Sequence, residues 1–175
     1  MSQNFSKEWS LLSDEMRGKI ASLQMKAPVP LGAIASSLGL VVKLSTLPVG
    51  VSGEIRPDPD APKGFTIKVD RHEIKERQRF TLAHEIAHFL LHADLIENGL
   101  SDDVLYRSKL SNRREAEANR LAADIIMPLS LIREWMKQFP SSPPENYLDA
   151  IATYLGVSSL ALKVRLETAG KINDV

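Results

Sequence analysis

Residues 84–88 read His-Glu-Ile-Ala-His within an apolar stretch, and this pattern constrains the fold more than any other part of the chain. The stretch, Phe80–Leu91, is apolar on nearly every face, so a helix formed from it should be buried. Buried His and Glu side chains destabilise a fold unless they have partners. His84 and His88 share one helical face and can bind one metal ion, with Glu85 placed to activate a water molecule. The alternative is two core histidines bonded to backbone carbonyls, with Glu85 at the surface.

The sequence contains no cysteine, which excludes disulfide bonds, thiolate metal sites and cysteine nucleophiles together. Histidine, aspartate and glutamate are therefore the side chains left to bind a metal ion. A catalytic zinc ion usually has three protein ligands and one open position. With His84 and His88 as two of them, we expect a carboxylate as the third ligand, and one zinc or other divalent ion per chain.

Two glutamates in a predicted helix over residues 112–127 compete for the role of third ligand. On a helical wheel with about 100° per residue, Glu115 lies in the middle of the apolar face. The opposite face carries Glu117, Asp124 and Arg120. We therefore predict that Glu115 faces the core and binds the metal ion, and that the opposite face is in solvent.

Two further residues of this helix bear on the role of Glu115. Asn119, one turn later, can hydrogen-bond a ligand histidine and hold it in position. Asn112, three residues before Glu115, also fits a capping box, in which Glu115 would bond the end of its own helix. Both interpretations stay open on this helix alone, and the motif at His84 favours the metal ligand.

Three side chains outside the motif are candidates for a role near it. His92 lies one turn after His88, but its place at the predicted helix end favours an exposed side chain. His72 precedes the helix and is expected to be structural. Tyr106 lies in the long segment after the helix and is a candidate hydrogen-bond donor to a developing oxyanion.

Periodicity and turn residues predict a small sheet followed by helices. Helices are expected over residues 6–26, between Pro30 and Gly39, and over 73–92, 112–127, 129–139, 145–155 and 158–169, the last stopping at Gly170. Strands are expected over residues 40–46, 51–56 and 65–69 in a simple antiparallel arrangement. Residues 57–64 are a predicted connecting loop, 93–112 a long, partly helical loop, and 140–144 a linker. The strand at 65–69 is a candidate for holding an extended substrate by edge pairing.

The overall composition limits the classes of partner. The 175 residues include 22 basic and 22 acidic ones, so no global field attracts nucleic acid or an anionic membrane. The polar N-terminus has no apolar signal core, and no run approaches the roughly 18 apolar residues of a membrane span. We therefore expect a cytoplasmic protein of one domain, without a membrane partner.

Two blocks of sequence together resemble the ImmA/IrrE family of metallopeptidases. They are residues 78–88, QRFTLAHEIAH, and residues 115–128, EAEANRLAADIIMP. Including the preceding strands and the helical tail, the resemblance covers roughly residues 28–170. The usual family motif has phenylalanine where this chain has Leu121, which is a change in packing.

The resemblance implies an α+β fold with a zincin-like core, in which a small, mostly antiparallel sheet packs on the metal-binding helices and a C-terminal helical region follows. We expect a peptidase domain over residues 1–140, and a helix-turn-helix-like tail over 145–175 packed on the same domain. The resemblance also implies that His84, His88 and Glu115 are zinc ligands and that Glu85 is the catalytic glutamate.

Family members act on protein substrates, typically helix-turn-helix repressors of the Xre class, and their cleavage lifts repression of mobile-element or stress genes. The resemblance therefore implies an Xre-type repressor as the substrate of this chain. Because the chain ends soon after the helical tail, we expect no counterpart of the additional C-terminal sensor domain of the radiation-response members.

Two other functions compete with peptide hydrolysis. Residues 151–157 and 158–166 resemble a helix-turn-helix, which would suit a DNA-binding regulator. The second of these helices offers only Lys163 and Arg165 as cations, with Glu167 nearby, which is little for phosphate contact. We therefore expect no direct binding to nucleic acid, and interpret the tail as packing or substrate recognition. The other possibility is a metal-binding switch that depends on a partner and turns over little by itself.

Overall fold

The computed structural model describes residues 5–97, 109–140 and 144–173, and the side chains within them except those of residues 109–111 and 171–173. The helices are α1 (Lys7–Leu11), α2 (Asp14–Leu23), α3 (Leu31–Ser37), α4 (Lys75–Glu97), α6 (Lys109–Ile126), α7 (Leu129–Met136), α8 (Tyr147–Leu155) and α9 (Ser159–Asn173). The strands are β1 (Val41–Ser45), β2 (Gly53–Pro57) and β3 (Phe65–Asp70).

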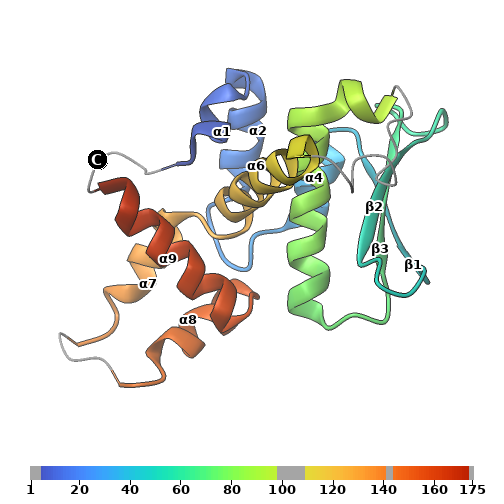
Figure 1. The fold of residues 1–175 in the computed structure, drawn as a ribbon. Helices are drawn as coiled ribbons and strands as arrows, with labels where there is room; N and C mark the ends of the chain where they lie inside the picture. The colour runs from blue at the N-terminus through green and yellow to red at the C-terminus, as the bar shows by residue number, and fades with distance from the viewer. Residues whose placement is uncertain (1–4, 98–108, 141–143, 174–175) are drawn as a thin grey trace.

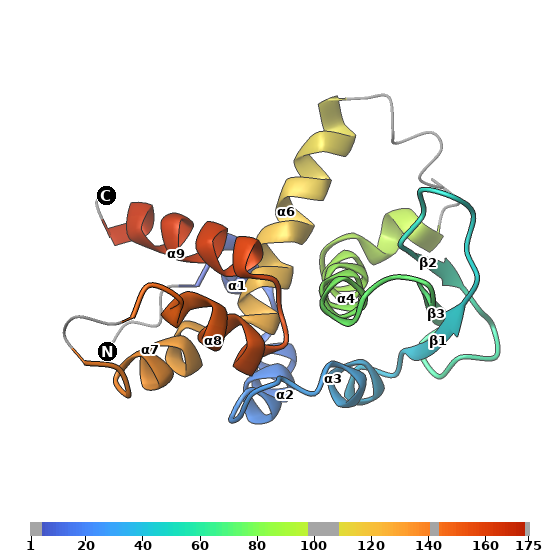
Figure 2. The same cartoon turned by 90° about the horizontal axis from the view of Figure 1, so that it is seen from below.

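Helix α4 is the centre of a layered arrangement. Figure 2 views α4 nearly end-on, with the sheet on one side and α6 on the other, and α7, α8 and α9 lie beyond α6. Figure 1 shows α6 crossing α4, which contacts both β2 and β3. The sheet and α6 therefore enclose the helix that carries the His-Glu-Ile-Ala-His motif.

The sheet is mixed, with the order β1-β3-β2. Strand β2 pairs antiparallel with β3, whereas β1 pairs with β3 in parallel, with Val42 opposite Ile67. The predicted α+β fold class is confirmed, but the purely antiparallel arrangement is wrong for the β1–β3 pair. Because β3 is the central strand, the prediction that residues 65–69 pair with a substrate at an open edge is also wrong. The outer strand that contacts α4 is β2.

Small residues allow α4 and α6 to cross closely. Ala83 and Ala87 on α4, and Ala118 and Ala122 on α6, are all fully buried. Helices approach closely where the side chains at the crossing are small. On the other side of α4, the Phe89 ring packs edge-on against Phe65 of β3, with ring centroids 5.4 Å apart. The apolar stretch of α4 is therefore packed on two sides, against α6 and against β3, as its composition predicts.

Several predicted boundaries are wrong, including the following three. The helix expected over residues 6–26 is divided at Leu12, which is extended, and Ser13 caps α2 by accepting a hydrogen bond from the Met16 amide at 3.3 Å. The predicted loop after residue 92 begins later, because α4 continues to Glu97 beyond a non-helical residue, His92. Helix α9 does not stop at Gly170 and ends at Asn173.

The buried carboxylate of Asp124, on α6, hydrogen-bonds residues near both ends of the chain. The two side-chain oxygens of Asp124 accept hydrogen bonds from the Ser6 amide at 2.9 Å and from the Arg165 guanidinium at 2.7 Å. Asp124 and Arg165 have 0% and 3% of their side chains exposed. The predicted solvent face of α6 is therefore wrong at Asp124, because α1 and α9 cover it. Arg120, on the same face, forms an ion pair at 2.6 Å with Glu8.

Among the residues that the structure describes, no helix combines the length and the apolar character needed to span a bilayer.

Candidate metal centre

Two helices bring three potential metal ligands to one point. His84 and His88 are on α4, and their Nε2 atoms lie 3.0 Å apart. Glu115, on α6, uses a different carboxylate oxygen for each histidine. Oε2 lies 3.1 Å from Nε2 of His84, and Oε1 lies 3.1 Å from Nε2 of His88. One donor atom from each of these three side chains lies within 4.8 Å of the other two. Among the described residues, this is the group of His, Asp and Glu side chains that meets this distance. Two imidazoles and one carboxylate are the donors expected for a catalytic zinc ion.

Glu115 and Glu117 differ in position as predicted, but not in exposure. Glu115 is the glutamate that reaches the histidines, yet 47% of its side chain is exposed. Glu117 is on the predicted solvent face, but only 19% of its side chain is exposed, because it contacts His92 and Arg113. The capping box is wrong, since α6 begins at Lys109 and Asn112 lies inside the helix.

The remaining ring nitrogens of the two histidines are held by partners. Nδ1 of His84 lies 3.0 Å from the side-chain oxygen of Asn119, as the sequence predicted. Nδ1 of His88 lies 3.1 Å from Nδ1 of His92. When Nδ1 carries the proton and donates it to such a partner, the Nε2 lone pair is free to bind a metal ion. Both imidazoles therefore direct Nε2 towards the same point.

His92 extends these contacts to a second carboxylate. Its Nε2 lies 3.3 Å from Glu117, which also accepts a hydrogen bond from Arg113 at 2.9 Å. Only 9% of the His92 side chain is exposed, so the prediction of an exposed side chain is wrong. The signal available in the sequence was the spacing, because His92 follows His88 by four residues on one helical face.

The electrostatics favour an ionised carboxylate between the two imidazoles. Hydrogen bonds from His84 and then His88 hold the pKa of Glu115 well below its usual value, despite partial burial. Burial opposes the charged form of His84, but its hydrogen bond with Glu115 and the charges of Glu85 and Glu115 outweigh this and raise the His84 pKa. A negative charge between two nitrogen donors suits a divalent cation.

Glu85 lies beside β2, on the sheet side of α4. Its residue is 8% exposed, so the interpretation that places Glu85 at the surface is wrong. A Cβ at Gly53 would overlap the Thr81 methyl group and would lie 3.4 Å from Oε1 of Glu85. The absence of a side chain at residue 53 therefore lets β2 approach α4 next to this carboxylate.

The remaining two candidates are His72 and Tyr106. His72 is exposed and is 3.2 Å from the Thr46 hydroxyl, which agrees with a structural role. Tyr106 lies outside the described residues, so its role as an oxyanion donor stays a prediction.

Comparison with known proteins identifies relatives for most of the chain. The family model described as Peptidase_M78, IrrE N-terminal-like domain, matches residues 38–167. The chain is 39% identical over 80 residues, 45% of its length, to the "Radiation response metalloprotease IrrE" of Deinococcus radiodurans. It is 36% identical over 100 residues, 56% of its length, to the protein of the same name from Deinococcus deserti. These matches span 24% and 34% of the two relatives.

A solved structure supports the fold alone. A protein titled "Mycobacterium tuberculosis transcriptional regulator" superposes with a TM-score of 0.60 at 17% sequence identity. The superposition covers 94% of this chain and 48% of that protein.

Proposed function

This chain belongs to the IrrE N-terminal-like peptidase family, and we propose from this premise that it is a zinc-dependent endopeptidase acting on a protein substrate. The observation that carries the proposal is the convergence of His84, His88 and Glu115, with 3.0–3.1 Å between their donor atoms. In the same helix, Glu85 directly follows His84, and the residue is largely buried.

The donor set supports zinc as the ion. Zinc accepts imidazole and carboxylate ligands, and three protein ligands leave a fourth position for water or substrate. When bound, such an ion supplies Lewis-acid activation of a water molecule and of the scissile carbonyl group. Hydrogen bonds donated by Nδ1 of His84 to the Asn119 oxygen and by Nδ1 of His88 to Nδ1 of His92 would keep both rings in the ligating tautomer.

Glu85 is the proposed general base and acid. Its carboxylate takes a proton from the attacking water and then delivers a proton to the leaving amine, while the peptide C–N bond breaks. The charge of Glu85 also stabilises the cationic form of His84, which indicates that the two groups are electrostatically coupled. A partly enclosed carboxylate is suited to proton transfer because few water molecules compete with the substrate.

Strand β2 is the proposed support for an extended substrate segment. It is the outer strand next to α4, and its Gly53 lies beside Glu85. An extended peptide can pair with the outer edge of a strand through main-chain hydrogen bonds. Such pairing would bring a peptide bond of the substrate towards the group formed by the two histidines.

The proposed substrate is an Xre-type repressor, which is what the resemblance to ImmA/IrrE proteins implies. The proposed role is relief of repression by cleavage. The helical tail, residues 145–175, is proposed to be part of the same domain as residues 1–140. In support, Arg165 bonds Asp124 at 2.7 Å, and Arg79 of α4 donates to the Gly156 carbonyl at 3.0 Å.

Metal binding should separate the two glutamates of α6. We expect about one equivalent of zinc in purified protein, as for one catalytic site, and its loss in His88→Ala and Glu115→Gln. Glu117→Gln should retain the metal but bind it about 10–100-fold more weakly, because Glu117 orients His88 through His92. Elemental analysis and competition with a chromogenic chelator measure both effects. Stoichiometric metal in both His84→Ala and His88→Ala would contradict the proposed ligands.

Incubation with a repressor tests the substrate. Zinc-loaded protein should cut an Xre-type repressor from the same genome, preferably one encoded beside it, at one or a few bonds. Mass mapping of the fragments identifies them, and a chelator should abolish the cleavage. Generic denatured protein should be cut weakly. If unrelated peptides are cut freely while the repressor stays intact, the protein is better explained as a general peptidase. If cleavage occurs only when a partner protein is added, the metal-binding switch that depends on a partner is favoured.

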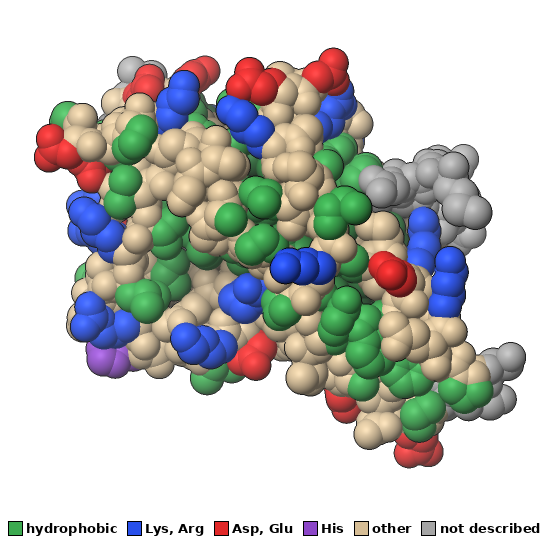
Figure 3. Space-filling model, turned by 180° about the vertical axis from the view of Figure 1, so that it is seen from behind, with side chains coloured by type: hydrophobic (Ala, Val, Ile, Leu, Met, Phe, Trp, Pro, Cys, Tyr) green, Lys and Arg blue, Asp and Glu red, His purple; other side chains and the backbone are tan. Residues whose placement is uncertain are grey.

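The structure weakens the DNA-binding alternative. Arg165, one of the two cations on which it depended, is buried and bonded to Asp124. Figure 3 shows Lys and Arg side chains scattered among hydrophobic ones on the face opposite to that of Figure 1, without a continuous basic band. Proteins that bind duplex DNA usually cluster their cations along one face. A salt-dependent mobility shift of duplex DNA would reverse this conclusion.

A further inference from the structure

The hydrogen bonds at both ends of β2 fix the direction of its main-chain groups. The Asp70 amide donates to the Ser52 carbonyl at 2.8 Å, and the Asp58 amide donates to the Gly64 carbonyl at 2.7 Å. Both pairs continue the antiparallel register of β2 with β3. In such a pair, every second residue exchanges hydrogen bonds with the neighbouring strand. The even-numbered residues of β2 therefore bond β3, and the odd-numbered residues direct their N–H and C=O groups to the outer edge.

The outer edge of β2 is short and ends at a proline. Its donors are the amides of Gly53 and Ile55, and its acceptors are their carbonyls and that of Pro57. Proline has no N–H group, so a strand laid along this edge loses its partner at Pro57. Among the described residues the sheet ends at β2, since its order is β1-β3-β2. A Cβ at Gly53 would lie 3.4 Å from Oε1 of Glu85, so a segment that pairs here begins next to the proposed general base.

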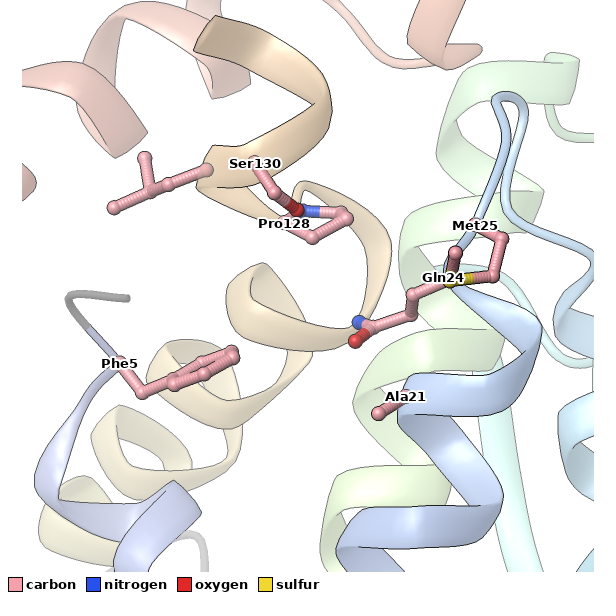
Figure 4. A pocket seen from close by; sticks show the side chains of 7 residues that line it. Phe5, Ala21, Gln24, Met25, Pro128 and Ser130 are labelled. Carbon is pink, nitrogen blue, oxygen red and sulfur yellow. The ribbon is translucent and has the colours of Figure 1, made fainter. Parts of the chain in front are cut away.

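Two cavities lie away from this edge. The smaller, about 150 Å³, lies between the N-terminal segment, α2 and the start of α7, and Figure 4 shows Phe5 on one side of it and Ala21 and Gln24 on the other. The larger, about 710 Å³, lies between the N-terminal segment and helices α4, α6 and α9. No residue of the sheet lines either cavity. Recognition along β2 therefore depends on the side chains of the strands themselves.

The side chains of β2 alternate between the two faces of the sheet. Gly53 faces α4, because a Cβ there would overlap the Thr81 methyl group, and Ile55 packs against the core from the same face. Glu54 and Arg56 therefore lie on the opposite face, away from α4. The side chains of a paired segment alternate in the same way, so every second one lies beside Glu54 or Arg56.

The two acidic side chains that flank Arg56 on that face already have partners. Glu54 lies 2.8 Å from Arg56 and 3.5 Å from Lys68, and only 14% of its side chain is exposed. Asp58 accepts a hydrogen bond from the Thr66 hydroxyl, on the side of β3. By contrast, 68% of the Arg56 side chain is exposed, and a guanidinium has five N–H donors. The charge that a paired segment meets at this edge is therefore positive.

We propose that Arg56 determines specificity by selecting an acidic side chain in the segment of the protein substrate that pairs with β2. A carboxylate opposite Arg56 can accept hydrogen bonds from the exposed part of the guanidinium, whose planar donors suit two carboxylate oxygens. Arg56 lies three residues beyond Gly53, so the selected residue lies about three residues, or about 10 Å of extended chain, from the cleaved bond. The inference rests on the proposed function, since it requires a substrate at His84 and His88.

Binding of peptide hydroxamates tests this selection without requiring turnover. A hydroxamate attaches to an open catalytic zinc ion, and the peptide attached to it can then pair along β2. Extended peptides of alanine and threonine carry the hydroxamate at either end, with glutamate, glutamine or lysine at each position in turn. They are titrated calorimetrically into the zinc-loaded and the metal-free protein. About three residues from the hydroxamate, glutamate should bind about two- to fivefold more tightly than glutamine, as is usual for an exposed ion pair. Lysine should bind more weakly than glutamine.

Variants of two exposed cations locate the effect. In Arg56→Glu the order should invert, so that lysine binds most tightly at that position, and in Arg56→Gln the three peptides should bind alike. Lys43→Glu, at an exposed residue of β1 on the opposite edge of the sheet, should keep the preference for glutamate. Equal affinities in the original protein, or a preference for glutamate that survives in Arg56→Gln, would overturn the role of Arg56 and leave the metal centre intact.

Methylation of single peptide amides tests the pairing itself. Each methyl group removes one N–H donor, and alternate amides of a paired strand face β2. The affinity should therefore fall at every second position. A loss that does not alternate would overturn the pairing, and the role of Arg56 with it. Failure of every hydroxamate to bind in a zinc-dependent manner would instead overturn the proposed function, on which the inference rests.

Discussion

Glu85→Gln should abolish hydrolysis and leave the metal in place. The substitution removes the proposed general base but none of the three ligands, His84, His88 and Glu115. Loss of a positioned acid or base usually lowers the rate by about 10²–10⁴-fold. Repressor cleavage by the variant should therefore fall by at least about a hundredfold, while elemental analysis still finds the metal that the unaltered protein holds.

Glu76→Gln is the matched control for this effect. Glu76 lies in the first turn of the same helix, two turns before the motif, and it belongs to no part of the proposed site. Its substitution should change neither cleavage nor metal content. Full activity in Glu85→Gln would remove Glu85 from the mechanism. Loss of metal from Glu85→Gln would mean that the carboxylate supports the ligands rather than the proton transfers.

Arg165→Ala should destabilise the fold strongly. The variant leaves Asp124, whose side chain is fully buried, with the Ser6 amide but without its cation. Removing one partner of a buried ion pair typically costs about 3–5 kcal/mol. Urea denaturation should show a loss of this size in the free energy of unfolding. The large cost arises from the uncompensated charge that remains, and the lost attraction alone would be worth less.

Two further variants separate this charge effect from the loss of helix α9 packing. Lys163→Ala, at an exposed residue of the same helix, should change the free energy of unfolding by no more than about 0.5 kcal/mol. The double variant Asp124→Leu with Arg165→Leu should recover much of the stability lost in Arg165→Ala, since no buried charge remains. A double variant as unstable as the single one would show that the ion pair is not the cause.

The sequence alone predicted the geometry around the motif because that geometry is local. The spacing of His84 and His88 fixes both side chains on one face of a helix. The direction of Glu115 follows from its angle on a helical wheel, and so does the position of Asn119 one turn later. These relations depend on the 3.6-residue period, and no distant contact is needed to establish them.

Exposure could not be predicted in the same way, because it depends on segments far away in the sequence. Asp124 and Glu117 lie on the face of α6 that the helical wheel assigned to solvent. In the structure Asp124 meets Arg165 and the N-terminal segment, and Glu117 meets His92. A helical wheel describes the direction of a side chain, but which segment covers that direction is a property of the whole fold.

The order of the strands could not be predicted from the sequence for a similar reason. Strands β1 and β2 are consecutive along the chain, but both pair with β3, which lies between them. Alternation of apolar residues identifies a strand without specifying its neighbour. The parallel pairing of β1 with β3 therefore became clear only in three dimensions, and with it the identity of β2 as the outer strand beside Glu85.

The contacts of Asp124 have a consequence for the order in which the chain assembles during folding. Its partners lie 118 residues before it, at Ser6, and 41 residues after it, at Arg165. Contacts of high sequence separation close long loops, and such contacts form slowly because closure costs chain entropy. On the ribosome, α4 and α6 can meet before α9 has been synthesised. The carboxylate then stays hydrated until Arg165 arrives, so its burial belongs to the last stage of folding.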